Sequence, residues 1–174
     1  MTLKGVASMG ELIRAPDPAI VALRCHSETL GAACDALDLD APMANRFTER
    51  AGILIAAIGP DDWLVIADDT ESPVLEQRLQ AALAGHHAAV VDVSGNRVRY
   101  RLDGPDAATL LAHGCSIDLE RLPVGSCIGT LLARAQIILL KRDSGFDLFP
   151  RRSFAAYVEA WFASGVAPHA VHRG

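Results

Sequence analysis

Residues 53–67, with the sequence ILIAAIGPDDWLVIA, decide the fold. Two apolar runs are separated by Gly59-Pro60-Asp61-Asp62, in which the proline fixes the backbone for a tight turn. Two such runs joined by a short turn predict a β-hairpin. Residues 137–149, IILLKRDSGFDLF, repeat the pattern, with Asp143-Ser144-Gly145 as a three-residue turn.

A helix is predicted after each hairpin. The first begins at the N-cap Ser72, has Pro73 at its first position and ends before Gly85. The second follows the N-cap Ser153. It carries the strongest apolar stripe of the chain, at positions i, i+3, i+4, i+7 and i+8, namely Phe154, Tyr157, Val158, Trp161 and Phe162. This stripe predicts a helix that packs one face against the core.

A strand and a helix also precede each hairpin. Residues 20–25 alternate as a strand, and Ser27 is a predicted N-cap for the helix that follows. In the second half, short strands at 89–91 and 97–102 lead to a helix that stops at Gly114. The repeated order of strand, helix, hairpin and helix predicts a duplicated α+β fold, with helices on one face of mainly antiparallel sheets.

The repeat also predicts where the domain and its two halves begin and end. We expect one domain over residues 18–163, made of two halves at about 18–87 and 88–163. Residues 1–17 lack periodicity and end in Ala15-Pro16-Asp17-Pro18, so they are predicted to be an extended arm. Residues 164–174 are predicted to be a loose tail.

Composition narrows the class of protein. Sixteen Lys and Arg residues against 21 Asp and Glu residues give a net charge of −5, which would repel a phosphate backbone, so no nucleic-acid partner is expected. The apolar stretches are too short for a membrane span, and the N-terminus has no signal-peptide pattern, so we expect a cytoplasmic protein. The four cysteines are isolated and are predicted to be free.

No motif for catalysis or for cofactor or metal binding emerges. No two of the 14 glycines are spaced as G-x-G, which a dinucleotide-binding turn requires. His113, Cys115 and Cys127 are too few and too far apart in sequence to indicate a zinc site. We therefore predict no catalytic, cofactor-binding or metal-binding residue on this chain.

Arginine spacing is the one unusual surface pattern. Arg97, Arg99 and Arg101 recur at period two on one face of a predicted strand, and Arg151 and Arg152 precede the last helix. One interpretation is a solvated sheet face whose arginines pair with Asp92 or Asp103. The other is a partner-docking surface, because arginine is enriched at interfaces. These five arginines are the candidate docking residues.

Several short motifs carry a resemblance to known families. Residues 92–107 resemble the segment that opens the folate-binding domain of the glycine-cleavage aminomethyltransferase family. A more specific set consists of G-C-x-x-D-L at 114–119, G-x-x-x-x-T-L-L at 125–132 and R-S-F-A at 152–155. Together these motifs resemble the gamma subunit of heterotetrameric sarcosine oxidase, over about residues 18–163.

This resemblance implies a non-catalytic structural subunit of a four-subunit flavoenzyme. Such an enzyme oxidatively demethylates sarcosine to glycine, passes the one-carbon unit to tetrahydrofolate or releases formaldehyde, and forms hydrogen peroxide. The resemblance places FAD, FMN, NAD, tetrahydrofolate and zinc on the alpha, beta and delta partner subunits. It also implies that the gamma chain packs chiefly against the alpha subunit.

Two other functions stay open from the sequence. One is a stand-alone folate-binding protein of the aminomethyltransferase type. The other is the gamma subunit of a related N-methyl amino acid dehydrogenase, for instance one acting on N-methylglutamate, with substrate choice residing in another subunit.

Overall fold

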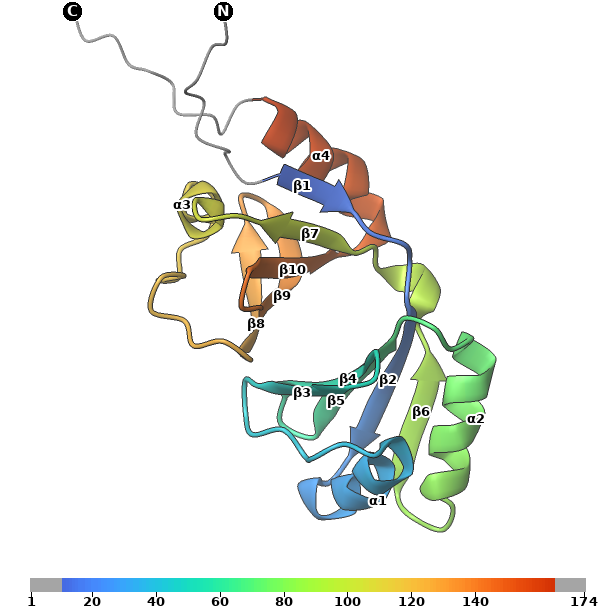
Figure 1. Cartoon of the computed structure of the whole chain (residues 1–174). Coiled ribbons are helices and arrows are strands. Elements are labelled where there is room, and N and C mark those ends of the chain that lie inside the picture. The colour runs from blue at the N-terminus through green and yellow to red at the C-terminus, as the bar shows by residue number, and fades with distance from the viewer. Residues whose placement is uncertain (1–10, 165–174) are drawn as a thin grey trace, which may run out of the picture.

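The structure, a computed structural model, describes residues 11–164 and contains two five-stranded antiparallel sheets (Figure 1). In spatial order, the first sheet consists of β3 (Phe47–Arg50), β4 (Ile53–Gly59), β5 (Asp62–Ala67), β2 (Ala19–Cys25) and β6 (Ala88–Asp92). The second consists of β8 (Cys127–Leu132), β9 (Ala135–Lys141), β10 (Gly145–Pro150), β7 (Tyr100–Asp103) and β1 (Glu11–Arg14). The helices are α1 (Ser27–Leu37), α2 (Ser72–Ala82), α3 (Ala107–Ala112) and α4 (Ala155–Ala163), with short 3₁₀ turns η1 (Ser94–Asn96) and η2 (Arg152–Phe154).

The two sheets have the same order of elements. β2, α1, β3, β4, β5 and α2 of the first half correspond in turn to β7, α3, β8, β9, β10 and α4 of the second. In the first sheet the strand beside β2 is β6, which follows α2. In the second sheet the corresponding place beside β7 is taken by β1, from the other end of the described chain. The predicted duplication is therefore present, with the last strand of the second half supplied by the N-terminal segment.

This arrangement differs from the predicted boundaries. Residues 11–14 of the predicted extended arm form β1 and pair with β7, with Leu12 opposite Leu102, so this part of the arm belongs to the second sheet. Residues 88–92 form β6 and pair with β2, so they complete the first sheet, although the predicted boundary assigns them to the second half. Residues 1–10 of the predicted arm and 165–174 of the predicted tail lie outside the described residues.

Both predicted hairpins are confirmed. Ile55 lies opposite Val65 in the first, and Leu139 lies opposite Leu148 in the second. The turn of the first hairpin also serves α1, because the Ser27 backbone N–H donates to Asp61 Oδ1 at 3.2 Å. The N-terminus of α1 is therefore capped by a side chain from a distant turn.

Each of the three predicted serine caps is wrong by one residue. His26, Glu71 and Phe154 occupy the N-cap positions of α1, α2 and α4, and none of them makes a side-chain capping hydrogen bond. Ser72 instead donates its hydroxyl to Asp92 Oδ2 at 2.7 Å, which ties the start of α2 to the end of β6. The serine is thus used in a tertiary contact.

Apolar side chains form three layers. Those between the first sheet and its helices include Val21, Leu23, Leu30, Leu37, Ile55, Val65, Leu75 and Leu79. Those between the second sheet and its helices include Leu102, Leu111, Ile137, Leu139, Phe146, Leu148 and Val158. Those between the two sheets include Ile20, Leu54, Leu64, Ile66, Cys127, Ile138, Leu140 and Phe149. Since successive strand residues face opposite sides, the central strands bury both faces, and the helices lie on the outer sides of the two sheets (Figure 1).

The stripe on α4 is less buried than predicted. Val158 is fully buried, and Trp161 and Phe162 are partly buried and pack on the second core. Phe154 and Tyr157 remain 38% and 37% exposed. Because Phe154 precedes the nine-residue helix and α4 contacts the sheet along one narrow side, the full stripe is not covered.

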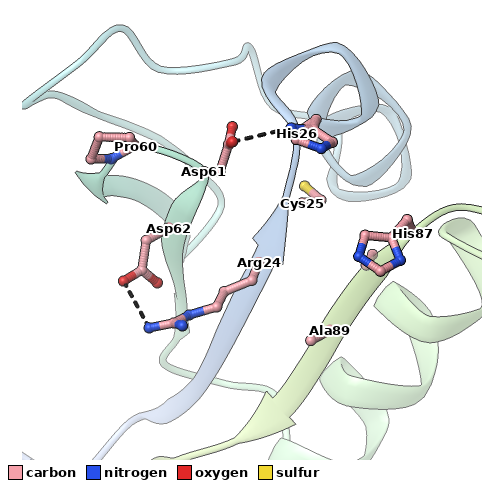
Figure 2. Close-up of a pocket in the computed structure, with 9 residues that line it drawn as sticks. Arg24, Cys25, His26, Pro60, Asp61, Asp62, His87 and Ala89 are labelled. Carbon is pink, nitrogen blue, oxygen red and sulfur yellow. Dashed lines mark hydrogen bonds and ion pairs between the residues drawn. The ribbon is translucent and has the colours of Figure 1, made fainter.

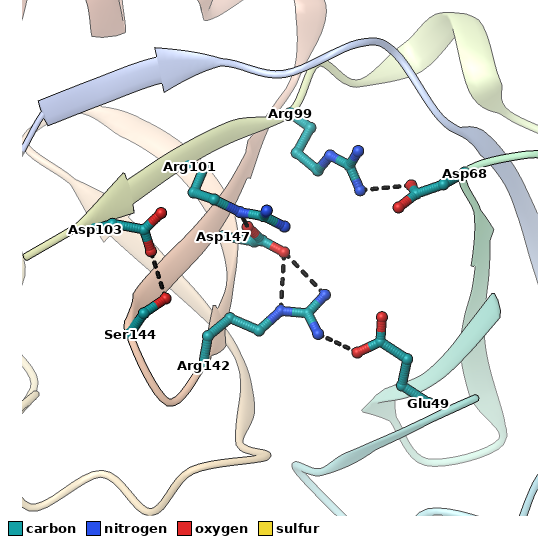
Figure 3. Close-up of polar contacts among 8 residues, drawn as sticks. All are labelled: Glu49, Asp68, Arg99, Arg101, Asp103, Arg142, Ser144 and Asp147. Carbon is teal, nitrogen blue, oxygen red and sulfur yellow. Dashed lines mark hydrogen bonds and ion pairs between the residues drawn. The ribbon is translucent and has the colours of Figure 1, made fainter. Parts of the chain in front are cut away.

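A partly buried ion-pair network, centred on the buried Asp147, crosses between the sheets (Figure 3). Asp147 of β10 is inaccessible to solvent, and its two oxygens accept hydrogen bonds from Arg101 Nε at 3.0 Å and Arg142 Nε at 2.9 Å. The same Arg142 guanidinium pairs with Glu49 of β3, in the first sheet. One carboxylate inside the second half is thus connected to the first half through a single arginine.

None of the helices between residues 11 and 164 is long and apolar enough to cross a membrane.

We predict that Asp147→Asn lowers the free energy of unfolding by about 3 kcal/mol, because a neutral amide leaves two guanidinium groups without their buried counter-charge. The matched control is Asp118→Asn, which removes an exposed pair with Arg121 and should cost less than about 1 kcal/mol. Urea unfolding of the three proteins at one pH measures both values. Equal stability of the two variants would contradict the assigned role of Asp147.

We also predict that Gly145→Ala disrupts the pairing of β10 with β7. A Cβ at this position would clash with the Leu102 carbonyl oxygen and lie 2.9 Å from Asp103 Cα, both in the backbone of the neighbouring strand. We expect a loss of about 2 to 3 kcal/mol in unfolding free energy. Gly129→Ala is the control: no atom lies within 4 Å of its added Cβ, so stability should stay the same or rise by roughly 0.5 kcal/mol. A stable Gly145→Ala variant would refute the close packing.

Candidate partner interface

The arginine row faces the other half of the molecule. Arg97, just before β7, is half-buried and donates from Nη1 to the Phe149 carbonyl oxygen at 2.8 Å. Arg99 donates from Nη1 to Asp68 Oδ1 at 2.6 Å, and Arg101 contacts Asp147 (Figure 3). The shared face that period two predicts is therefore present. It is the face turned toward the first sheet.

The carboxylates predicted to pair with this row have other partners. Asp92 accepts hydrogen bonds from Ser72 and from the backbone and hydroxyl of Ser94, and these contacts lower the pKa of its carboxyl, with the Ser94 hydroxyl as the largest cause. Asp103 accepts from the Ser144 hydroxyl at 2.7 Å. The prediction that Asp92 or Asp103 pairs with the arginines was wrong because proximity in sequence does not indicate which carboxylates lie on the same face: Asp68 comes from the other half, and Asp147 comes from the neighbouring strand β10.

Arg99 is an internal link between the halves. Its side chain is only 8% exposed, and its carboxylate partner Asp68 follows β5 of the first sheet. Its Nε is buried and has no hydrogen-bond partner among the described residues. Arg99 therefore serves the packing of the two sheets, as Arg142 does.

The adjacent residues Arg151 and Arg152 differ in their polar partners. Arg152 donates from Nη2 to Asp17 Oδ2 at 2.8 Å and from Nε to the Gly95 carbonyl oxygen at 2.9 Å. Arg151 reaches only Asn96 Oδ1, at 3.4 Å, and has no carboxylate partner within residues 11–164.

Arg151 also lies beside Arg97, with which it forms an isolated antiparallel bridge. Burial lowers the pKa of the Arg97 guanidinium, and the positive charge of Arg151 lowers it further. Of the five candidate docking residues, Arg99, Arg101 and Arg152 thus pair with carboxylates of this chain, whereas Arg97 and Arg151 have no carboxylate partner among the described residues. Docking by these arginines stays a prediction.

A cavity of about 530 Å³ lies at one end of the first sheet (Figure 2). The end of β2, the β4–β5 turn and the start of β6 line it. His26 Nδ1 lies 3.1 Å from Asp61 Oδ2, and Arg24 Nη2 lies 3.4 Å from Asp62 Oδ2. Burial, followed by the charge of Asp61, raises the pKa of the nearby Cys25 thiol, so this thiol is protonated at neutral pH.

The other thiols are similarly unreactive. Burial is the largest cause of the raised pKa of Cys34 and Cys115, each to about 11, and of Cys127, to about 12. All four cysteines are free and buried. In the part of the chain that the structure describes, no group of three or more His, Cys, Asp or Glu side chains is placed to hold a metal ion.

Sequence reasoning missed several exposed apolar residues of the second half. Leu131 on β8, Phe154 and Tyr157 are large hydrophobic side chains left partly in solvent, and Arg134 occupies the β8–β9 turn between Leu132 and Ala135. Apolar residues at helical spacing predict a core, and no local signal distinguishes a covered stripe from an exposed one. Tyr and Phe are among the residue types enriched at protein interfaces, so these exposed side chains are candidates for contact with another protein.

The family model and three of the most similar curated sequences all name the same subunit. The model of the sarcosine oxidase, gamma subunit family matches residues 21–168. Sarcosine oxidase subunit gamma of Corynebacterium sp. (strain U-96) is 30% identical over 139 residues, which cover 78% of this chain and 67% of that protein. The chain spans 59 to 67% of the length of the curated gamma subunits that it matches.

Two solved structures resemble the fold. A chain of the heterotetrameric sarcosine oxidase from Corynebacterium sp. U-96, in complex with pyrrole 2-carboxylate, superposes with a TM-score of 0.83 at 27% identity, covering 92% of this chain and 86% of that chain. Aminomethyltransferase T of the glycine cleavage system from Bartonella henselae gives a TM-score of 0.70 at 16% identity, covering 91% of this chain and 46% of that chain. The predicted α+β fold of the aminomethyltransferase type is confirmed. Because the family model covers most of the sequence, this chain belongs to the sarcosine oxidase gamma subunit family.

Proposed function

We propose that this chain is a non-catalytic assembly subunit of a heterotetrameric sarcosine oxidase. Such a complex oxidatively demethylates sarcosine to glycine, transfers the one-carbon unit to tetrahydrofolate or releases formaldehyde, and produces hydrogen peroxide. The observation that carries the proposal is the superposition on a chain of the Corynebacterium complex, which extends over 92% of this chain.

The internal chemistry of the chain supports a structural role. Arg99, Arg101 and Arg142 are engaged in holding the two sheets together, and the buried thiols have raised pKa values. These groups act within the fold. We propose that FAD, FMN, NAD, tetrahydrofolate and zinc are bound by the alpha, beta and delta subunits, that the alpha subunit is the chief contact of this chain, and that the complex is cytoplasmic.

The likeness to aminomethyltransferase T favours a second candidate, a stand-alone folate-binding protein. The matched region is only 46% of the aminomethyltransferase, so more than half of that enzyme has no counterpart in this alignment. At 16% identity the likeness shows the fold alone. A third candidate, the gamma subunit of an N-methyl amino acid dehydrogenase, shares the assembly role and differs only in the substrate of the partner subunits.

We predict that the tagged chain, co-expressed with the alpha, beta and delta subunits, co-purifies with them at a fixed ratio and with sarcosine-dependent formation of hydrogen peroxide. The isolated chain should show no such activity. Flavin absorbance, subunit stoichiometry and peroxide yield are the measurements. Expression of the three other subunits without this chain is the control, and it should lower the yield of assembled complex.

Other results would replace the proposal. A stable isolated chain that binds tetrahydrofolate in calorimetry and joins no flavoprotein would establish the second candidate. A complex that oxidises N-methylglutamate in place of sarcosine would establish the third.

A further inference from the structure

Of the four edge strands between residues 11 and 164, only β8 has no charged residue. β1 carries Glu11 and Arg14, β3 carries Glu49 and Arg50, and β6 ends in Asp92. The sequence of β8 is Cys-Ile-Gly-Thr-Leu-Leu, with neither a charge nor a proline. Charges and prolines protect an edge strand from pairing with another chain, because a free edge presents unpaired N–H and C=O groups. β8 lacks this protection.

One hydrogen bond identifies which backbone groups of β8 lie on its free edge. The Cys127 N–H donates to the Asn45 carbonyl oxygen at 2.8 Å, on the side away from β9. In an antiparallel pair, the N–H and C=O groups of every second residue point to the same side. Those of Gly129 and Leu131 therefore also point away from β9, and they have no backbone partner within residues 11–164.

The chain itself covers only the start of this edge. Arg46 forms an antiparallel bridge with Ser126, just before β8 begins. A turn immediately precedes Arg46, and Asn45 in this turn adopts a left-handed backbone with φ of 57°. The pairing therefore stops at Cys127, and the outer edge over residues 128–132 has no partner among the described residues.

An exposed apolar side chain accompanies the open edge. Cys127 is buried in the layer between the two sheets, so strand alternation places Leu131 on the same face of β8. Leu131 extends beyond that layer, because it is 53% exposed. The edge thus offers main-chain groups at Gly129 and Leu131 together with an apolar contact at Leu131. Main-chain pairing and side-chain contacts at alternate positions are how an added strand is recognised.

Arg46 indicates one property of the occupant. Its Nη1 donates to the Ser126 hydroxyl oxygen at 3.2 Å, and it forms no ion pair within residues 11–164. An added strand would end beside Asn45, the neighbour of Arg46. An acidic side chain at that end would supply the carboxylate that this guanidinium lacks.

A second copy of this chain fits the edge less well. Antiparallel pairing of two β8 strands places the start of each strand beside the end of the other. The outer edge at the start already carries Asn45 and Arg46, which would meet the other copy's turn at Ala133 and Arg134. A segment of a different protein brings no such obstruction.

We propose that the open edge of β8, residues 128–132, pairs with an extended segment of a partner subunit. This segment is apolar where it faces Leu131 and acidic where it ends near Arg46. It adds a strand to the second sheet through the N–H and C=O groups of Gly129 and Leu131. The inference rests on the proposed function and specifies the surface through which the chain joins its complex.

The test is the double variant Gly129→Pro/Leu131→Lys, co-expressed with tagged partner subunits. Proline removes the outward N–H of residue 129 without removing a hydrogen bond to β9, and lysine replaces the apolar contact with a charge. We expect retention by the tagged partners to fall about tenfold, because one main-chain hydrogen bond and one apolar contact are lost. The matched control is Val74→Lys, which places the same charge at a 57% exposed apolar residue of α2 and should be retained like the wild type.

Hydrogen exchange gives a second readout on the wild type. In the isolated chain the amides of Gly129 and Leu131 should exchange fast, whereas those of Ile128, Thr130 and Leu132 point toward β9 and should exchange slowly. In the complex, exchange at Gly129 and Leu131 should slow by roughly tenfold or more. Unchanged exchange at these two amides in the assembled complex would overturn the proposed pairing.

A folding control accompanies the variant. Circular dichroism and thermal melting of the isolated double variant should match those of the wild type, because both changes lie at exposed residues of an edge strand. If the proline prevents folding, Leu131→Lys alone changes one exposed side chain and should still lower retention severalfold.

The outcomes separate the two proposals. Normal retention of the folded double variant would overturn the strand pairing and leave the assembly role intact, as would an equal loss of retention in Val74→Lys. Self-association of the isolated wild-type chain that the double variant abolishes would also overturn it, because the occupant would then be a second copy. Failure of the wild type and of Val74→Lys to join any complex would overturn both proposals.

Discussion

The central strands of both sheets are apolar on both faces, while helices cover only one face of each sheet. The uncovered faces must therefore meet, and the layer that includes Ile20, Leu64, Ile138 and Phe149 results from this contact. Burial of apolar area is non-directional, so it brings the sheets together without fixing their relative placement. Placement requires contacts with defined geometry.

Those contacts are polar and lie beside the apolar layer. Arg142 joins Asp147 of the second sheet to Glu49 of the first, and Arg99 reaches Asp68 across the same boundary. A buried ion pair adds little net stability compared with an apolar replacement, because both charges lose their hydration. Its geometry is restrictive, however, so these pairs limit how the two sheets can be placed relative to each other. Arg99 and Arg101, whose spacing suggests a docking surface, thus form ion pairs within the chain.

Features set by neighbouring residues could be predicted from the sequence. The turns at Gly59-Pro60 and at Gly145, and the helices that follow the hairpins, depend on local backbone preferences. The pairing of β1 with β7 could not be predicted, since a four-residue strand carries almost no periodic signal. The arginines on one strand face were predicted as a row. Their partners Asp68 and Asp147 were not, because alternation shows which residues share a face and does not show what that face contacts.

The position of β1 has a consequence for how the chain folds. The first sheet consists of strands that are all synthesised before residue 93, so it can close as soon as this segment is available. The second sheet is complete only when β1, made before all of the first half, meets β7, made after it. Its closure is a long-range event that requires a loop spanning the whole first half, and the entropy of that loop slows the step. The two halves share an architecture, yet the second should acquire its edge strand late, when the first is already folded and holds β1 in reach.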